Sequence, residues 1–480
     1  MGWVEGSQRA FVVPEKPGNR PAGTRWREGG LRSTEPKRGT MSGSPNLGSI
    51  STRLRRIAQL AREDRERSFL SLAHNIDEYW LRAAYSRTRK DGAAGIDGQS
   101  AKQYAEDLQG NLRSLLDRFK SGLYRAPPVR RAHIPKGNGS ETRPIGIPTF
   151  EDKVLQRAVA MVLEAIYEED FLDCSYGFRP GRSAHDALGV LRGALTQLGG
   201  GWVLEVDIRN FFEELDFGHL RSFLDRRVRD GVIRRAIGKW LQAGVMEEGR
   251  LLPREKGTPQ GGVLSPLLAN IYLHEVVDRW FAEEVQPRLR GRAELVRYAD
   301  DLVIVFADEH DARRVAEVLS KRLARFGLRL HPEKTRRVPF RRPPWGSDGR
   351  GPGAPGSFVF LGFTHFWGKG RKQGSWVVKR KTAASRWTRA MVRAREGCRR
   401  CRHEPLADQQ RQLSRRLRGH YGYYGIRGNY RALDNFYRQV TREWRKWLDR
   451  RSGKKSMPWG RFRRLLDTYP LPRPRIVHAV

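Results

Sequence analysis

Two apolar runs joined by one acidic turn constrain this fold more than any other feature of the sequence. Residues 295–298 and 302–306 have the length and composition of buried strands, and only Ala299, Asp300 and Asp301 separate them. A connection this short can join two strands only as a tight antiparallel hairpin. The pattern therefore predicts that Asp300 and Asp301 lie together at the tip of a rigid hairpin.

A third carboxylate follows another predicted strand. Residues 202–206 form an apolar run, and Asp207 stands at its end. Neighbouring carboxylates repel each other, and a hard divalent cation such as Mg²⁺ removes that penalty while keeping coordination sites for phosphates. Two such ions about 3.5–4 Å apart are suited to phosphoryl transfer. On these residues alone, an ordinary role of the aspartates as turn formers stays open.

The net charge and the cysteine content indicate which kind of molecule the protein binds and in which compartment it is found. Lys and Arg total 92 against 53 acidic residues, which gives a net charge of +39. This charge predicts a polyanionic partner. Nucleic acid is the favoured partner, and an acidic membrane surface is the alternative. No apolar run is long enough to span a bilayer and no signal peptide is evident, so we expect a soluble intracellular protein. Cys398-x-x-Cys401 with nearby His403 could be half a zinc site, but two reduced thiols on a basic helix are favoured.

The organisation of the 480-residue chain predicts several domains. Residues 1–50 are rich in Gly, Pro, Ser and Arg and are expected to be disordered, and the first forty could be upstream reading frame. Strand-like runs are predicted at 130–135 and 143–147, and an amphipathic helix is predicted over 152–168. Alternating strand and helix patterns continue to about residue 340, which indicates an α+β fold. A Pro/Gly-rich loop covers 341–357, and a very basic helical region begins near 382. One apolar stripe at helical spacing is predicted in this region, at Leu433, Phe436, Tyr437, Val440, Trp444, Trp447 and Leu448.

Further blocks accompany Tyr298-Ala-Asp-Asp301 in a fixed order. They are Ile134-Pro-Lys136, Arg143-Pro-Ile-Gly-Ile-Pro148, Ser175-Tyr-Gly-Phe-Arg-Pro-Gly-Arg-Ser183, Val206-Asp-Ile-Arg-Asn-Phe-Phe212, Gly257-Thr-Pro-Gln-Gly-Gly-Val-Leu-Ser-Pro266, His331-Pro-Glu-Lys-Thr335 and Phe360-Leu-Gly362. Each block is moderately specific, and the ordered set is very specific. Over about residues 52–480 the chain resembles the reverse transcriptases and maturases encoded by bacterial group II introns.

The resemblance implies a right-hand polymerase of fingers, palm and thumb. The N-terminal extension and fingers would cover 51–200, and the palm with its active site would cover 201–375. A helical thumb, the maturase X domain, would cover 376–452, and a basic C-terminal tail would cover 453–480.

The resemblance also implies a role for particular residues. The catalytic metals, two Mg²⁺ ions for which Mn²⁺ can substitute, would be held by Asp207, Asp300, Asp301 and the main-chain carbonyl of Ile208. The incoming dNTP would meet Lys136, Arg143, Gln260 and Phe212, the last as the gate against a ribose 2′-hydroxyl. Template and primer would meet Arg179, Arg182, Gly261, Phe360, Leu361 and Gly362. RNA would meet the thumb at Tyr421, Tyr423, Tyr424, Arg438 and Arg442.

Physical reasoning supports several of these roles and leaves alternatives beside them. Lys136 and Arg143 flank a Gly-Asn-Gly turn, so a hairpin could aim both cations at one triphosphate. They could equally be solvated surface cations. Phe212 could be a core residue, and so could the thumb tyrosines, although aromatics among Gly and Arg suit RNA stacking.

The function implied is an RNA-dependent DNA polymerase that binds its structured intron RNA, assists splicing and copies the RNA from a DNA primer at the target. The expected location is the bacterial cytoplasm, at the nucleoid when DNA is engaged, and the oligomeric state is undefined. The chain leaves no room after residue 452 for the Cys-rich endonuclease of many relatives, so it resembles the short form. A free-standing reverse transcriptase of defence or repair, or a splicing cofactor without polymerase activity, are the alternatives; the intact aspartates argue against the cofactor.

Overall fold

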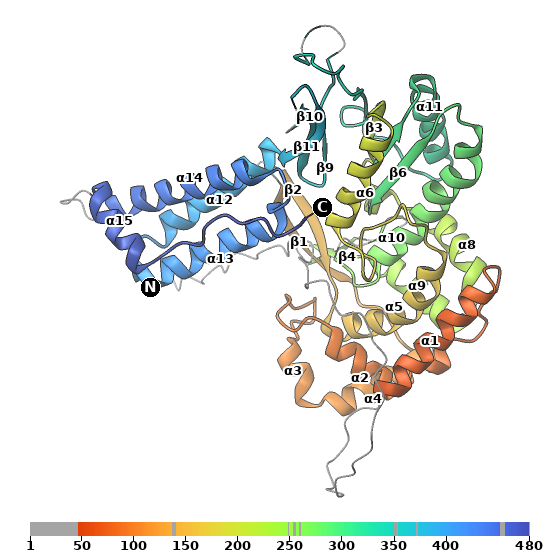
Figure 1. Cartoon of the computed structure of the whole chain (residues 1–480). Coiled ribbons are helices and arrows are strands. Elements are labelled where there is room, and N and C mark those ends of the chain that lie inside the picture. Colours follow the sequence, from red (N-terminus) through yellow and green to blue (C-terminus); the bar gives the residue numbers. More distant parts are fainter. Residues whose placement is uncertain are drawn as a thin grey trace, which may run out of the picture. The chain divides into compact units, whose positions relative to one another are not determined.

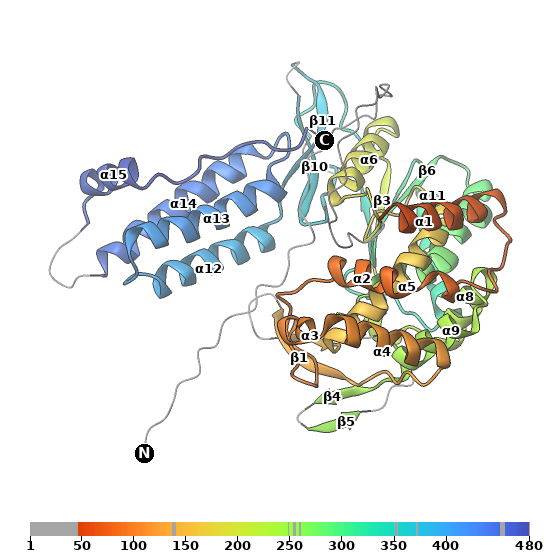
Figure 2. The same ribbon diagram turned by 90° about the horizontal axis from the view of Figure 1, so that it is seen from below.

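The chain forms two compact units, Met41–Arg380 (the large unit) and Lys381–Val480 (the helical unit). The computed structural model describes residues 47–479, apart from 137–140, 248, 253–255, 259–260, 350, 352–353, 371–372 and 452–456. Helices and sheets are mixed in the large unit, whereas helices dominate the helical unit, which confirms the predicted α+β class (Figures 1 and 2). In the described part of the chain no helix is both long and apolar enough to cross a membrane.

The N-terminal part of the large unit packs its helices around one buried helix, α5 (Phe150–Asp170), which confirms the helix predicted over 152–168. Apolar residues of α5 are buried on most sides, so it forms the centre of this region. Its buried neighbour Trp80 donates its indole N–H to the carbonyl oxygen of Ala158 at 3.0 Å. The surrounding helices are α1 (Leu47–Glu63), η1 (Ala73–Asn75), α2 (Glu78–Arg87), α3 (Ala101–Glu106) and α4 (Leu108–Ser121).

The expectation of disorder over residues 1–50 is wrong at its C-terminal end. Residues 1–46 lie outside the described residues, but α1 begins at Leu47, and Ile50 is buried in the core. Ile50, Leu54 and Ile57 are spaced at i, i+4 and i+7, so they share one face of the helix. Burial of that face against α5 explains why the helix starts earlier than composition suggested.

The hairpin predicted from residues 130–135 and 143–147 is confirmed. Strands β1 (Val129–Lys136) and β2 (Glu141–Ile147) pair antiparallel, with Ile134 opposite Arg143 and Lys136 opposite Glu141. They belong to a sheet with strand order β2-β1-β4-β5, completed by β4 (Val245–Glu247) and β5 (Arg250–Leu252). The turn 137–140 lies outside the described residues.

The central sheet has strand order β6-β7-β3-β8 and carries the predicted acidic hairpin. Its strands are β3 (Trp202–Asp207), β6 (Ala293–Tyr298), β7 (Asp301–Phe306) and β8 (Arg336–Pro339). Helix α6 (Ala184–Gln197) packs against β6, and α11 (Glu309–Arg325) packs against β3 and β7. The other helical segments of the large unit are α7 (Phe211–Glu214), α8 (Phe217–Arg227), α9 (Gly231–Gln242), α10 (Ser265–Leu273), the π-helical η2 (His274–Asp278) and η3 (Trp280–Val285), and η4 (Gln286–Arg288).

A third sheet, with strand order β11-β10-β9, follows the Pro/Gly-rich loop. Its strands are β9 (Phe358–Phe360), β10 (Phe363–Lys369) and β11 (Trp376–Thr382). His365 of β10 is fully buried and stacks on Phe358, with ring centroids 4.8 Å apart and planes 6° apart. Burial lowers the pKa of His365 to about 3, and the charge of Arg380 acts in the same direction.

His365 should make folding sensitive to acid. Because the folded-state pKa of about 3 lies below the usual 6.5, the unfolded chain binds the extra proton between these values and stability falls as pH falls. The slope approaches about 1.4 kcal/mol per pH unit. In the wild type, the free energy of unfolding should fall between pH 6.5 and pH 5. We expect this fall to be about 2 kcal/mol smaller in His365→Leu, measured by denaturant unfolding. His403→Leu, at an exposed position, is the matched control; equal pH dependence in both variants and wild type would contradict the prediction.

The helical unit confirms the predicted apolar stripe. Helices α12 (Ala384–Arg400), α13 (Leu406–Tyr424) and α14 (Tyr430–Asp449) run side by side, and α15 (Trp459–Thr468) follows (Figures 1 and 2). The stripe on α14 is buried at Leu433, Phe436, Tyr437, Val440, Trp444 and Leu448, with Trp447 partly buried. Cys398 and Cys401 are also buried, and burial raises the pKa of the Cys398 thiol to about 12. Neither cysteine forms a disulfide in the described part of the chain.

The segment expected as a basic C-terminal tail is an integral part of the helical unit. Helix α15 buries Phe462 completely in the unit's core. Farther along, the carbonyl oxygen of Pro472 accepts a hydrogen bond from the Tyr421 hydroxyl at 3.2 Å, and His478 forms a β-bridge with Ile426. The basic composition of this segment concealed its few apolar anchors.

Candidate active site

The tip of the β6–β7 hairpin presents the paired aspartates, as the sequence predicts. Tyr298 pairs with Asp301, so Ala299 and Asp300 form the turn. Ala299 has a φ of 57°, the left-handed region that a non-glycine residue adopts only when its surroundings hold it there. The turn that carries Asp300 is therefore held in a costly conformation by neighbouring residues.

Asp207 lies beside this hairpin because β3 pairs with β7. The register places Asp207 directly opposite Asp301, and opposite residues in an antiparallel pair have Cβ atoms about 4.5–5.5 Å apart on one face of the sheet. The Lys334 ammonium lies 3.7 Å from the Asp207 carboxylate, so this carboxylate already attracts a cation. The Asp207 main-chain oxygen accepts the His331 N–H at 2.8 Å, and Ile208 bridges to Leu330.

These oxygen donors fit a hard divalent cation such as Mg²⁺. Three other side chains of the described residues could also hold a metal ion. The ligand atoms of Asp308, His310 and Asp311 all lie within 4.8 Å of one another. Asp308 accepts the Asp311 N–H at 3.0 Å as the N-cap of α11, and Asp311 accepts two further backbone N–H groups at 2.9 Å. Since those oxygens already accept hydrogen bonds from the backbone, this cluster is the start of a helix.

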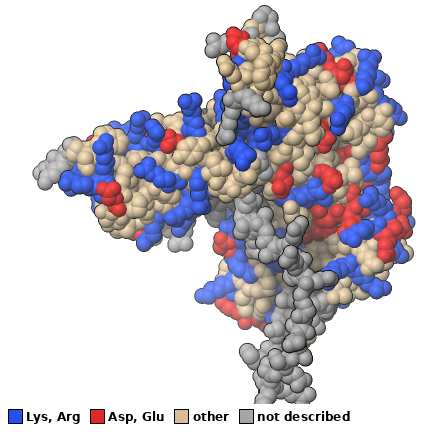
Figure 3. Space-filling view, in the orientation of Figure 1, with Lys and Arg blue, Asp and Glu red and all other residues tan. Residues whose placement is uncertain are grey.

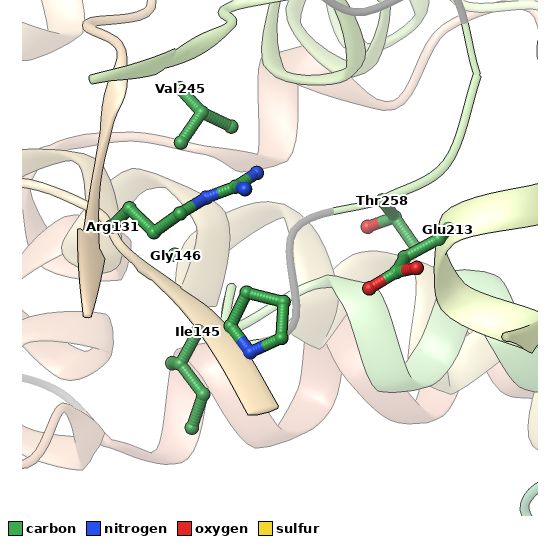
Figure 4. A pocket seen from close by; sticks show the side chains of 7 residues that line it. Arg131, Ile145, Gly146, Glu213, Val245 and Thr258 are labelled. Carbon is green, nitrogen blue, oxygen red and sulfur yellow. The ribbon is translucent and has the colours of Figure 1, made fainter. Parts of the chain in front are cut away.

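A cavity of about 380 Å³ lies between the β1–β2 hairpin and α7. Arg131 and Glu213 project into it from opposite sides, and Ile145, Gly146, Val245 and Thr258 line it (Figure 4). This is the size of a small-molecule site. Sequence reasoning missed Arg131, Glu213 and Thr258, although Glu213 directly follows the predicted gate Phe212.

Two of the predicted nucleotide contacts are chain neighbours of residues that line this cavity: Phe212 precedes Glu213, and Arg143 precedes Pro144. Phe212 is half-buried on α7, packs edge-on against Phe211 with ring centroids 5.3 Å apart, and accepts the Thr258 N–H through its carbonyl at 2.7 Å. Arg143 is exposed on β2, on the same face of the hairpin as position 136. The Lys136 side chain and Gln260 lie outside the described residues.

Gly261 explains the close approach of the loop after residue 256 to β2. Its φ is 116°, and a Cβ there would lie 2.6 Å from the Gly146 carbonyl oxygen, so only glycine fits. The far end of the loop is held by Gln156, whose side-chain oxygen accepts the N–H groups of Val263 and Leu264 at 2.9 and 3.3 Å. Residues 261–264 of the loop therefore lie between the β1–β2 hairpin and α5.

The predicted primer support is a tight turn between β9 and β10. Phe360 pairs with Phe363, and Leu361 and Gly362 form the turn with φ values of 48° and 80°. Glu205, on β3 and on the same face as Asp207, accepts the Val359 N–H at 2.7 Å. The same carboxylate pairs with Arg336, so this turn is tied to the strand that carries Asp207.

Arg179 was predicted to contact the template, and the structure contradicts this. Its side chain is 4% exposed and pairs with Glu168 at 3.0 Å. Its other nitrogens donate to the carbonyl oxygens of residues 171, 172 and 175, so this buried side chain holds the loop together. Arg182 is partly exposed, pairs with Asp173 and lies over the Tyr176 ring at 5.3 Å.

In the helical unit, the prediction that Tyr421 binds RNA is also wrong. Tyr421 is almost completely buried among α13 and α14, because it continues the apolar face of α13. Tyr423 and Tyr424 are half-buried, Arg442 is exposed, and Arg438 is exposed but pairs with Asp434 at 2.8 Å. On the face that Figure 3 shows, Lys and Arg side chains are scattered over both units, while most of the acidic side chains belong to the large unit.

Several known proteins are similar in sequence to this chain. Residues 134–365 match the family model described as reverse transcriptase (RNA-dependent DNA polymerase). The chain is 34% identical over 286 residues to the group II intron-encoded protein LtrA of Lactococcus lactis subsp. cremoris, covering 56% of this chain and 46% of LtrA. It is 35% identical over 291 residues to protein YkfC of Escherichia coli (strain K12), covering 53% of this chain and 75% of YkfC. The chain belongs to the group II intron reverse transcriptase family.

The relatives of this group II intron reverse transcriptase extend to plants. It is 31% identical over 177 residues to nuclear intron maturase 2, mitochondrial, of Arabidopsis thaliana, covering 28% of this chain and 24% of that protein. The chain spans about half the length of LtrA. The family match confirms the predicted polymerase fold, and enzymes of this family use divalent metal ions.

Proposed function

We propose that this group II intron reverse transcriptase is an RNA-dependent DNA polymerase that extends a DNA primer on an RNA template. The observation that carries the proposal is the register of the central sheet, which aligns Asp207 with Asp301 next to the Asp300 turn. Asp207, Asp300, Asp301 and the Ile208 carbonyl would hold two Mg²⁺ ions, with Mn²⁺ as a substitute. Bound there, the ions would lower the pKa of the primer hydroxyl and stabilise charge on the pyrophosphate.

The protein's own residues would bind and orient the two substrates. Lys136 and Arg143 would hold the triphosphate from one face of the β1–β2 hairpin, and Gln260 and Gly261 would border the new base pair. The Phe360–Gly362 turn would support the primer end, with Glu205 fixing its distance from Asp207. The domain roles follow the same scheme: fingers over 51–200, palm over 201–375 and thumb over 376–452.

Primer extension tests this proposal directly. Purified protein should incorporate dNTPs on an RNA template with an annealed DNA primer and Mg²⁺, measured as extended product on a sequencing gel. Omitting the metal or the RNA template provides the controls. A protein that binds the primer–template but extends nothing would be a splicing cofactor.

Phe212 is expected to select the sugar. A ribose 2′-hydroxyl would collide with the aromatic ring, and removing a ring opens space without touching the phosphate contacts. We expect Phe212→Val to raise the relative kcat/KM for ribonucleotides by about 10–200-fold, the range of discrimination that pocket size provides. The matched control is Phe211→Leu, at a buried neighbour. Unchanged sugar discrimination in the Phe212 variant removes it from this role.

We further propose that the RNA bound is a structured group II intron RNA, that the protein assists its splicing, and that a DNA 3′ end at the target primes the copy. The support is the name of LtrA as a group II intron-encoded protein and the net charge of +39. Exposed Arg442, Arg438 and half-buried Tyr423 and Tyr424 would contribute to RNA binding in the helical unit. Binding of the parental intron should be tighter than binding of an unrelated RNA of equal length, measured at several salt concentrations.

A further inference from the structure

We propose that Arg297 is a positioning residue that fixes the catalytic turn and, through it, Asp300. This inference rests on the proposed polymerase function and adds a residue to its machinery. Arg297 precedes Tyr298 on β6 and has no contact with solvent. Burying a charged side chain costs free energy unless all of its hydrogen-bonding groups have partners. The partners of Arg297 therefore indicate its role.

The Arg297 guanidinium connects the catalytic turn to a fully buried acid. Its Nε and Nη2 donate to the two oxygens of Asp278 at 2.7 and 2.5 Å, a bidentate pair. Its Nη1 donates to the main-chain oxygen of Ala299 at 3.1 Å. Ala299 is the turn residue with positive φ, so Arg297 holds the strained peptide that immediately precedes Asp300.

The same side chain fixes a second segment against the turn. Nη2 donates to the Ser175 hydroxyl at 2.8 Å, and Nη1 donates to the Asn270 side-chain oxygen at 3.0 Å. Asn270 in turn donates to the Gly177 carbonyl oxygen at 2.7 Å. A Cβ on Gly177 would lie 2.4 Å from the Ala299 nitrogen, so this loop lies directly on the catalytic turn.

Asp278 is the buried carboxylate that holds the Arg297 guanidinium in place. It ends the π-helical segment η2, a rare conformation that is frequent at functional sites, and it is fully buried. Burial lowers the pKa of Arg297, but the adjacent Asp278 outweighs burial, and the net pKa is raised. The guanidinium is therefore charged.

Lysine cannot replace this arrangement. The five donors of arginine lie in a fixed planar fork that serves Asp278, Asn270, Ser175 and the Ala299 carbonyl together, whereas an ammonium has three donors and no fork. Arg297→Lys would keep the charge opposite Asp278 and release the turn. Residues that orient the ligands of a metal typically contribute about 10–100-fold to metal affinity or activity.

The competing explanation is that Arg297 only stabilises the fold, and the chain offers a matched control. Arg227 is also buried, pairs with Asp170 at 2.9 Å and donates to three main-chain carbonyl oxygens, of Ala61, Asp64 and Arg67. It belongs to α8, and its hydrogen bonds and its ion pair join α1, the segment that follows α1, and α5. Arg227→Lys should therefore lower stability as much as Arg297→Lys does, without changing chemistry.

The experiment compares Arg297→Lys, Arg227→Lys and wild type in the full chain. We expect Arg297→Lys to lower kcat of primer extension about 10–100-fold with little change in KM for the primer–template. It should also weaken Mn²⁺ binding, measured by electron paramagnetic resonance in a complex with dNTP and a chain-terminated primer. Arg227→Lys should change only the melting temperature. Equal kcat and equal Mn²⁺ affinity in the two folded variants would overturn the inference.

A milder substitution keeps the inference testable if Arg297→Lys does not fold. Ser175→Ala removes one acceptor of the network and is expected to lower kcat several-fold and weaken Mn²⁺ binding in the same direction. No change in either quantity overturns the inference. If wild type extends no primer, the proposed function fails, and the Mn²⁺ titrations alone then decide whether Arg297 orders the turn.

Discussion

Replacing Asp300 with asparagine is expected to reduce kcat of primer extension by at least about 1,000-fold, equivalent to about 4 kcal/mol in the activation barrier. Asparagine has the shape of aspartate and can occupy the same turn, so the fold should persist. What is lost is the negative charge at the hairpin tip that would bind the cation. The measurement is single-turnover extension by one dNTP, with circular dichroism to verify folding.

Asp308→Asn is the control for this prediction. It makes the same chemical change in the cluster of Asp308, His310 and Asp311, whose possible ligand atoms lie within 4.8 Å of one another. Asparagine caps a helix as well as aspartate does, so we expect wild-type kcat and stability. Loss of extension in Asp308→Asn with retention in Asp300→Asn would move the metal centre to the start of α11.

Adding one methyl group at Gly177 is expected to reduce kcat by about 100-fold. The Cβ of Gly177→Ala would lie 2.4 Å from the Ala299 nitrogen and 2.9 Å from the Tyr298 carbonyl carbon, so the catalytic turn has to move. A displacement of about 1 Å in a reacting group can lower a rate about 100-fold, and overpacking costs about 1–3 kcal/mol of stability. Steady-state extension kinetics and denaturant unfolding measure both effects.

Gly181→Ala separates this effect from the general cost of alanine in the same loop. Gly181 has a φ of 71°, and a Cβ there meets nothing within 4 Å. Alanine should therefore cost about 1 kcal/mol of backbone strain and leave kcat unchanged. The close approach at Gly177 has no catalytic importance if both variants extend primers at the wild-type rate.

The local structure of the site could be predicted because it depends on neighbours in sequence. Two apolar runs separated by three residues can only form a hairpin, so the strands β6 and β7 and the turn at Asp300 followed from spacing. The apolar stripe of α14 followed in the same way from helical periodicity. The errors at α1 and α15 arose where composition was used in place of spacing.

The roles of single polar residues could not be predicted in this way. Arg179 and Arg182 are both arginines in one block, yet Arg179 is buried against Glu168 and Arg182 is partly exposed. Tyr421 and Tyr423 differ in the same manner on α13. Burial depends on which distant segment packs over a residue, and the sequence around each residue does not contain that information.

The sequence by itself determined the family, the α+β class and the acidic hairpin, because these depend on residue order and on periodicity within short segments. Only the tertiary structure decided what holds that hairpin in place. Three partners of Arg297, at residues 175, 270 and 278, lie 122, 27 and 19 positions from it along the chain. A buried charge needs all of its partners in three dimensions, so its purpose became visible only once the chain was folded.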